Sequence, residues 1–272
     1  MSENKVALIT GSARRIGASI VSKFHSEGFD VIVHARSSTD AAQELMEKMN
    51  SIRANSANLV LANLTETEEV EQLPQQALQC FGRIDVLVNN ASAFYPTPIK
   101  EATQNDWDEL FNSNVRAAYF LCQKLADELI KNEGAIINIV DTHADNPLSN
   151  HSIYNMAKAA LKTMTKSLAK DLGPTVRVNG ISPGAILWPT PLENEDGPEV
   201  MQARERIMKG IPLNRLGDPE DIAAMTYFLA IEASYVTGQV IKVDGGRSSV
   251  SYTHLRAHET RHDLVCRLLL EK

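Results

Sequence analysis

Three residues in the middle of the chain have side chains that could move a proton. Tyr154 and Lys158 are four residues apart, so on a helix both side chains lie on one face. A free phenol has a pKa of about 10, and a neighbouring ammonium lowers that pKa by favouring the phenolate. Asp141 stands thirteen residues before the tyrosine. A tyrosine and a lysine at this spacing also occur on helix surfaces, but with the other features below they indicate general acid–base catalysis.

The carboxylate at position 141 restricts the kind of substrate. An ionised carboxylate only accepts hydrogen bonds, so Asp141 would repel the oxyanion that develops when a carbonyl is reduced. It suits a substrate with N–H donors and a ring nitrogen that must be protonated. Thr142 follows directly and would supply a hydroxyl group if the loop were shifted by one residue.

A glycine-flanked turn near the N-terminus indicates a phosphate-binding site. Residues 10–17 read TGSARRIG and follow the apolar run Val6–Ile9. A turn between a strand and a helix presents backbone N–H groups to phosphate. Gly11 permits the tight turn and Gly17 permits close packing of the helix on the strand. By itself, such a turn is equally compatible with a purely structural role.

The end of the second apolar run indicates which dinucleotide is bound. An NAD enzyme needs a carboxylate there for the ribose hydroxyls, but this chain reads His34-Ala35-Arg36-Ser37. Arg36 and Ser37 could bind a 2′-phosphate, and Arg14 could add charge from the turn. Arg36 could also be a solvated loop residue. We expect NADP(H) rather than NAD(H).

Apolar strand-like runs alternate with helical stretches along the chain. The expected strands are Val6–Ile9, Val31–Val33, Asn58–Leu61, Ile84–Val88, Ala135–Val140, Val176–Ile181 and Gln239–Val243. The expected helices are Ile16–Gly28, Ala41–Met49, Glu66–Cys80, Trp107–Lys131 and one from near Tyr154 to about Leu172. This order predicts an α/β fold in a single domain, a doubly wound Rossmann-type sheet of seven parallel strands with helices on both faces. The segment Trp188–Gly217, rich in proline, glycine and acidic residues, resembles a mobile lid.

Composition excludes several classes of function. The chain has 272 residues and a net charge of −7, without a basic stripe, which argues against nucleic acid or an anionic membrane as the main partner. The three cysteines, Cys80, Cys122 and Cys266, are scattered, so we expect a reducing compartment and no metal cluster. The N-terminal strand is too short for a signal peptide or a membrane span, and we expect a cytoplasmic protein.

Several spaced motifs, occurring in order, resemble the short-chain dehydrogenase/reductase family. Besides the turn, they are Asn89-Asn90-Ala91, Asn114, Tyr154-x-x-x-Lys158, Pro183-Gly184 and Asp244-Gly245-Gly246. The resemblance covers about residues 5–250 and implies the same doubly wound sheet, usually in a homotetramer. It implies that Lys158 binds the nicotinamide ribose and that Asn114 holds a water molecule in a proton relay. Further cofactor-binding residues implied in this way are Arg15, Ile16, Asn63, Leu64, Asn90, Ala91, Pro183 and Gly184.

Two departures from the common family pattern resemble the pteridine reductases. Arg15 replaces a glycine of the turn, and Asp141 replaces the usual catalytic serine. The segment 90–98, NASAFYPTP, matches the same branch, and the match implies that Arg15, Ser92 and Phe94 line a pterin site beside Tyr154. Phe94 follows a strand end, where it could stack on a flat heterocycle. The resemblance implies NADPH-dependent reduction of a dihydropterin, with oxidised pterin or dihydrofolate as further substrates.

A third departure and two other functions stay open. Many relatives have an aspartate where this chain has Asn63, before Leu64, to contact adenine, and an amide can also hydrogen-bond adenine. A carbonyl or 3-oxoacyl thioester reductase of the same family is one alternative function. A binding protein that senses NADP(H) without turnover is another, although a sensor has no need of Tyr154 and Lys158.

The C-terminal segment contains a motif that we reject. His258-Glu259-Thr260-Arg261-His262 matches the H-E-x-x-H zinc protease signature, but too few residues surround it to supply a third ligand and a scaffold. Residues 251–272 resemble translated cloning-vector sequence. We therefore assign residues 1–250 to the reductase domain, exclude the tail from the fold and expect no metal site.

Overall fold

The apolar runs form one sheet in the computed structural model, which describes residues 4–188 and 197–249. Its strands are all parallel and follow the order β3-β2-β1-β4-β5-β6-β7. Their bounds are β1 Val6–Ile9, β2 Asp30–Ala35, β3 Ala57–Leu61, β4 Val86–Asn89, β5 Ala135–Ile139, β6 Arg177–Pro183 and β7 Val240–Val243. The predicted seven-stranded, doubly wound sheet is confirmed, with strand ends that differ from the prediction by one to a few residues.

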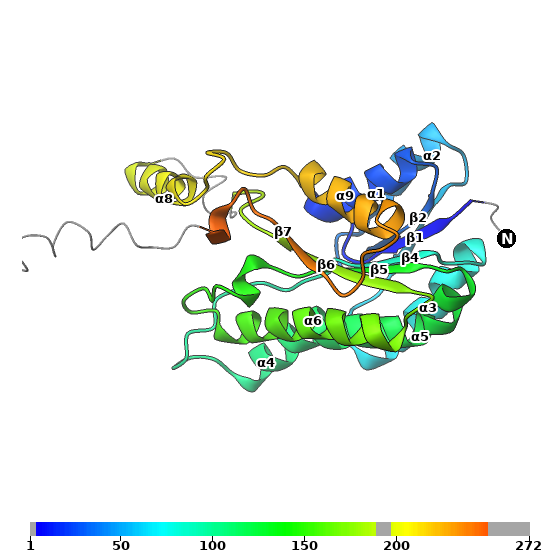
Figure 1. Ribbon diagram of the computed structural model, residues 1–272, viewed down its shortest axis with the longest axis horizontal. Coiled ribbons are helices and arrows are strands. Elements are labelled where there is room, and N and C mark those ends of the chain that lie inside the picture. Colours follow the sequence, from blue (N-terminus) through cyan, green and yellow to red (C-terminus); the bar gives the residue numbers. More distant parts are fainter. Residues whose placement is uncertain (1–3, 189–196, 250–272) are drawn as a thin grey trace, which may run out of the picture.

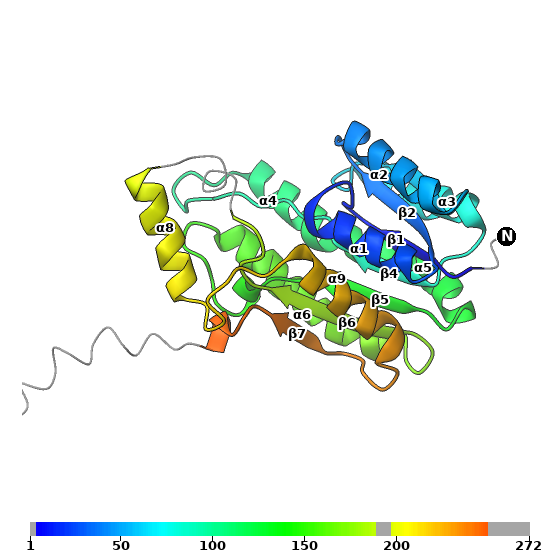
Figure 2. The same cartoon turned by 90° about the horizontal axis from the view of Figure 1, so that it is seen from above.

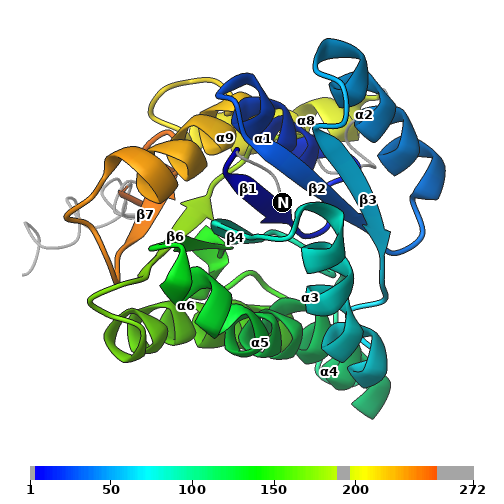
Figure 3. The ribbon, with the colours of Figure 1, turned by 90° about the vertical axis from the view of Figure 1, so that its right-hand side faces the viewer.

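Helices cover both faces of the sheet (Figure 1, Figure 3). One layer contains α1 (Arg15–Ser26), α2 (Thr39–Ile52) and α9 (Pro219–Tyr227). The other contains α3 (Thr67–Phe81), α5 (Ala117–Lys131) and α6 (Ser152–Asp171), with α4 (Gln104–Phe111) beside α6. A hydrophobic core lies on each face of the sheet, between the sheet and its helices. Alternate residues of β1 belong to different cores: Ala7 and Ile9 pack on one face, and Val6 and Leu8 pack on the other. A strand with both faces buried reads as a continuous apolar run, which is why the strands could be recognised.

The predicted helix Trp107–Lys131 is in fact three segments. Between α4 and α5 the backbone forms a short π-helical turn, η1, over Asn112–Arg116. Such widened turns often occur at functional sites, because they redirect one side chain without ending the helix. Here the turn contains Asn114, which is buried. Side-chain periodicity carries no clear signal for this extra residue.

The prediction for Trp188–Gly217 was incomplete. Part of that segment is the helix α8 (Pro198–Lys209), none of whose side chains is buried. Figure 2 shows α8 at the opposite end of the molecule from the N-terminus. Residues 189–196 lie outside the described part of the chain, so the lid remains a prediction, as do the predictions for residues 251–272. Within the described residues, no helix is both long and apolar enough to cross a membrane.

Candidate active site

The strand order reverses between β1 and β4, and ligands of such sheets bind at the carboxyl ends of the strands at this point. The motif after β4 is fastened to the turn after β1. The Nδ2 of Asn90 donates to the carbonyl oxygens of Thr10 and Gly11, both at 2.9 Å. The hydroxyl oxygen of Thr10 accepts the backbone N–H of Ala91 at 3.1 Å. These bonds fix the shape of the turn.

The glycines of the turn are required by close contacts. A Cβ atom at Gly11, which has a φ of +59°, would lie 2.7 Å from the Cα of Ala91. A Cβ at Gly17 would lie 2.6 Å from the carbonyl oxygen of Gly11. A side chain fits at neither position, so the backbone around the start of α1 stays open to a phosphate group. Arg15 also has a positive φ, 55°, at the first residue of α1.

His34 ties the ends of three strands together. Its Nδ1 accepts the N–H of Gly11 at 2.9 Å, so Nε2 carries the proton and donates to the carbonyl oxygen of Ala62 at 3.1 Å. Burial lowers the pKa of His34 to about 4. The neutral imidazole therefore holds the turn after β1 against the end of β3. Sequence analysis placed His34 in the cofactor site, and the structure gives it this supporting contact.

A cleft of about 450 Å³ opens above this turn. Predicted cofactor-binding residues that line it are Gly11, Arg14, Arg15, Ile16, Gly17, His34, Ala35, Arg36, Ser37, Asn63, Leu64, Asn90 and Ala91. The side-chain oxygen of Asn63 accepts the backbone N–H of Thr65 at 3.2 Å, and the contact of Asn63 with an adenine ring remains a prediction. The open backbone, the cleft and the cations fit a dinucleotide.

The residues predicted to transfer a proton lie beside the loop after β4, which lines the cleft at Ser92 and Ala93 and contacts Tyr154 through Phe94. The hydroxyl of Tyr154, which is 4% exposed, donates to Oδ2 of Asp141 at 2.7 Å. The other oxygen of Asp141 accepts the N–H of His143 at 2.8 Å. Burial, followed by the charge of Asp141, raises the pKa of Tyr154 well above 10. The expectation of a lowered pKa for Tyr154 is thus wrong for the chain by itself, because Asp141 opposes a phenolate.

Lys158 lies deep beneath the tyrosine. Its Nζ donates to the carbonyl oxygen of Ile139 at 3.0 Å and lies 5.7 Å from the ring centre of Tyr154. Complete burial lowers the pKa of Lys158 from 10.5 to about 8. The lysine is close enough to respond to charge on Tyr154 but forms no direct bond with its hydroxyl group.

Residues from the loop after β4 complete the site. The hydroxyl of Ser92 donates to Oδ1 of Asn114 at 2.7 Å, and Nδ2 of Asn114 donates to the carbonyl oxygen of Ala93 at 3.0 Å. Asn114 therefore fixes this loop, while its predicted role in holding water remains a prediction. Phe94 is 53% exposed, and its ring contacts Tyr154 edge-on with centres 4.8 Å apart. A half-exposed aromatic ring therefore lies next to Tyr154.

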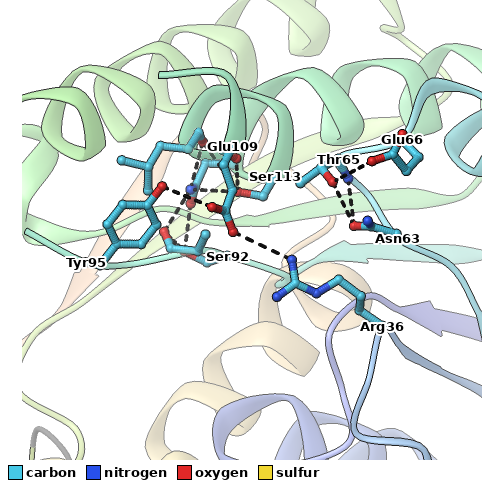
Figure 4. Close-up of polar contacts among 11 residues, drawn as sticks. Arg36, Asn63, Thr65, Glu66, Ser92, Tyr95, Glu109 and Ser113 are labelled. Carbon is cyan, nitrogen blue, oxygen red and sulfur yellow. Dashed lines mark hydrogen bonds and ion pairs between the residues drawn. The ribbon is translucent and has the colours of Figure 1, made fainter. Parts of the chain in front are cut away.

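Some predicted residues lie outside the cleft lining, and some site residues were missed. Four predicted cofactor-binding residues do not line the cleft: Tyr154, Lys158, Pro183 and Gly184. A Cβ at Gly184 would lie 2.6 Å from the Cα of Asp244. Sequence analysis missed His151, whose ring stacks on Phe94 at 4.8 Å. It also missed Glu109, which contacts residues of both the cleft and the loop (Figure 4). Neither has a local sequence signal, because both contacts join distant segments.

Comparison with known proteins finds oxidoreductases that match nearly the whole chain. A family described as enoyl-(acyl carrier protein) reductase matches residues 11–248. The chain is 36% identical to pteridine reductase 1 of Leishmania tarentolae, covering 89% of this chain and 96% of that protein. It is also 36% identical to a 3-oxoacyl-(acyl-carrier-protein) reductase of Thermotoga maritima, covering 90% and 98%. A 3beta-hydroxysteroid dehydrogenase 1 of Eggerthella lenta is 33% identical, covering 90% and 94%.

The doubly wound sheet has its cleft at the point where the strand order reverses, as in Rossmann-type proteins, and the matched relatives identify the chain as an oxidoreductase. The chain belongs to the short-chain dehydrogenase/reductase family, whose members use NAD(P)H.

Proposed function

We propose that this protein is an NADPH-dependent pteridine reductase that converts a dihydropterin to its tetrahydro form. The observation that carries the proposal is the 2.7 Å hydrogen bond from Tyr154 to Asp141. A carbonyl reductase needs hydrogen-bond donors around the developing oxyanion, and a carboxylate in that place is unfavourable. A pterin has N–H groups that a carboxylate can accept and a C=N bond whose nitrogen takes a proton.

The side chains have separate roles in this reaction. Bound NADPH supplies hydride to the carbon of the C=N bond. Tyr154, whose raised pKa keeps it protonated at neutral pH, donates a proton to the ring nitrogen. Asp141 accepts N–H groups of the substrate and orients the hydroxyl of Tyr154. Lys158, when protonated, stabilises the negative charge that remains on Tyr154 after the transfer.

Three further side chains hold the pterin in this proposal. Phe94 offers an exposed ring for stacking, next to Tyr154. Ser92 and Arg15 both line the cleft. Arg15 keeps a backbone conformation that costs about 1–2 kcal/mol for a residue other than glycine. Strain of this kind persists where a side chain is needed, which supports a binding role for Arg15.

The preference for NADPH rests on the end of β2. Arg36 and Ser37 line the cleft together with Arg14, and no carboxylate follows β2 in the sequence at the position that binds ribose in NAD enzymes. A guanidinium recognises phosphate through paired, charged hydrogen bonds. The homotetramer and the cytoplasmic location stay predictions from the sequence and the family resemblance.

The runner-up is a 3-oxoacyl thioester reductase, favoured by the equal identity to the Thermotoga maritima protein. In that case Thr142 would supply the hydroxyl. Thr142 is buried, however, and its hydroxyl is directed toward Asp141 at 3.5 Å. A sensing protein without turnover has no use for the buried Lys158, whose burial is unfavourable.

A substrate panel tests the proposal directly. Oxidation of NADPH and of NADH would be measured with dihydrobiopterin, dihydromonapterin, dihydrofolate and an acetoacetyl thioester. We expect turnover with at least one dihydropterin, faster with NADPH than with NADH. Turnover of the thioester alone would replace the proposal by the runner-up, and equal rates with both cofactors would refute the cofactor assignment.

A further inference from the structure

A carboxylate at the rim of the cleft contacts two segments that belong to different halves of the site. Glu109 lies on α4, with 42% of its side chain exposed. One of its oxygens is 3.7 Å from the guanidinium of Arg36, which follows β2. The other accepts the hydroxyl of Tyr95 at 3.1 Å, from the loop that also carries Phe94. Figure 4 shows the carboxylate between these two partners.

The position of Glu109 on its helix directs it to the cleft. Ser113, four residues later, lines the cleft, and its hydroxyl donates to the carbonyl oxygen of Glu109 at 2.7 Å. Arg36, the ion-pair partner of Glu109, also lines the cleft. The carboxylate therefore stands at the rim of the dinucleotide cleft and beside the cation to which we assign the 2′-phosphate.

Tyr95 anchors the carboxylate there. Burial raises the pKa of Tyr95 to about 12, and the hydrogen bond to Glu109 acts in the same direction. The hydroxyl is therefore a permanent donor at neutral pH. Because one carboxylate oxygen is held in this way, the other stays within reach of Arg36.

We propose that Glu109 determines how strongly the chain prefers a 2′-phosphorylated dinucleotide, by competing with that phosphate for Arg36. The inference rests on the proposed use of NADPH. A phosphate group carries more charge than a carboxylate and bonds a guanidinium through two oxygens, so it displaces Glu109 from Arg36. Breaking the ion pair subtracts from the free energy of binding the phosphorylated cofactor only. A cofactor without the phosphate does not meet this competition.

The alternative is a surface ion pair without effect on binding. Exposed pairs contribute little to folding stability, so removing the charge of Glu109 should leave the chain folded under either interpretation. Thermal unfolding of Glu109→Gln checks this point. Binding then separates the two interpretations, because only competition predicts a ligand-dependent effect.

The probes are 2′,5′-ADP and 5′-AMP, which differ in the 2′-phosphate, with affinities measured by calorimetry on the full chain. We expect Glu109→Gln to tighten 2′,5′-ADP on the order of fivefold, as for loss of an exposed ion pair, and to leave 5′-AMP unchanged. The matched control is Glu66→Gln, which removes the same charge near the cleft. Glu66 contacts Thr65 at 3.4 Å, on the side of Asn63 (Figure 4).

A second background tests whether the effect passes through Arg36. In Arg36→Ala, Glu109→Gln should no longer alter the affinity for 2′,5′-ADP, because there is no cation to release. An unchanged or weaker affinity of Glu109→Gln in the wild-type background would overturn this inference and leave the NADPH assignment intact. Equal binding of the two probes by the wild-type chain would overturn both. Equal tightening by Glu66→Gln would reduce the effect to general charge and overturn the competition.

Discussion

Position 141 determines which chemistry the site can perform. Asp141 accepts a hydrogen bond from the hydroxyl of Tyr154, and burial together with the charge of Asp141 raises the pKa of this tyrosine, which keeps it protonated. A serine at the same place would donate a hydrogen bond instead, which is what an alkoxide needs. We therefore propose that the side chain at this one position selects between proton delivery to nitrogen and stabilisation of an oxyanion.

Substitutions at positions 141 and 142 test this statement. We expect Asp141→Ala to lower kcat for a dihydropterin by roughly 10²–10⁴-fold, the usual size of a lost proton transfer, because the hydroxyl of Tyr154 loses the group that orients it. Asp141→Ser should not rescue pterin turnover, although it should create weak activity on a ketone. Steady-state kinetics on one dihydropterin and one ketone measure both effects. If Asp141→Ala has no effect on pterin reduction while Thr142→Val strongly lowers kcat, then Thr142, and not Asp141, is the working residue.

Arg15 presents a case in which binding and backbone preference oppose each other. Glycine adopts a positive φ without strain, so Arg15→Gly should leave stability unchanged or raise it by about 1 kcal/mol. The same change should raise KM for the pterin, because a cationic contact in the cleft is lost. Urea unfolding and substrate kinetics on one preparation check the two effects. A loss of stability with unchanged KM would show that the arginine has a structural role.

At Lys158, the proposed catalytic role and the stability of the fold oppose each other. Its pKa is about 8 in the folded chain and near 10.5 when exposed, so between these values the unfolded chain binds more protons and stability rises with pH. At pH 7 the cost of burying the charge is present in full. Lys158→Met should therefore abolish turnover, raise the free energy of unfolding by about 1–3 kcal/mol at pH 7, and flatten its rise above pH 8. Chemical denaturation at pH 7 and at pH 10 measures this, and a destabilised variant at pH 7 would contradict it.

At the scale of elements, the ends of β1, β2 and β3 are joined through one neutral imidazole. His34 has a pKa of about 4 in the folded chain, against an ordinary 6.5. Between pH 6.5 and pH 4 the unfolded chain therefore binds more protons at this residue than the folded chain, and the free energy of unfolding falls as the pH is lowered. His34→Gln should be less stable at pH 7, because the contacts to Gly11 and Ala62 are lost or weakened. Its stability should also fall less between pH 6.5 and pH 4. Parallel slopes for the two chains would show that His34 is not the titrating group.

The strands and most helices could be predicted, because a sheet buried on both faces leaves continuous apolar runs in the sequence. Helices α8 and α9 were not predicted. Helix α8 buries none of its side chains and so lacks a clear apolar stripe. Helix α9 has only nine residues, so its buried residues Ile222, Ala223 and Thr226 span too few turns to give a clear period. The π-helical turn at Asn114 was also missed, because one extra residue hardly alters the periodicity.

The site follows the same distinction. Tyr154, Lys158 and Asp141 were found from their types and spacing, and the structure brings Tyr154 and Asp141 into direct contact. The rise in the pKa of Tyr154 could not be predicted from the sequence, because it depends on burial and on where the carboxylate of Asp141 points. The contact between Arg36 and Glu109 joins residues from separate elements, and spacing along the chain does not predict such contacts.

At the scale of the whole molecule, the prediction for the C-terminal tail can be tested by truncation. Residues 250–272 lie outside the part that the structure describes. We expect a chain that ends at Val250 to keep its reductase turnover and its melting temperature, since the dinucleotide cleft and the proton-transfer residues precede that point. Enzyme assays and calorimetry on both chains check this. A zinc-dependent peptidase activity that His258→Ala removes would overturn our rejection of the H-E-x-x-H motif.

Two short hydrogen bonds close the base of the segment that carries α8. The N–H of Gly217 donates to the carbonyl oxygen of Ala185 at 2.9 Å, and the N–H of Gly184 donates to that of Val243 at 2.9 Å. The edge of the sheet is therefore tied at these two contacts, and α8 belongs to the segment between Ala185 and Gly217. Because closing a loop costs only about 0.6 kcal/mol more when its length doubles, segments of other lengths can be grafted between these two points. A chain with a shorter or longer segment at this point would therefore keep the sheet and the dinucleotide cleft unchanged.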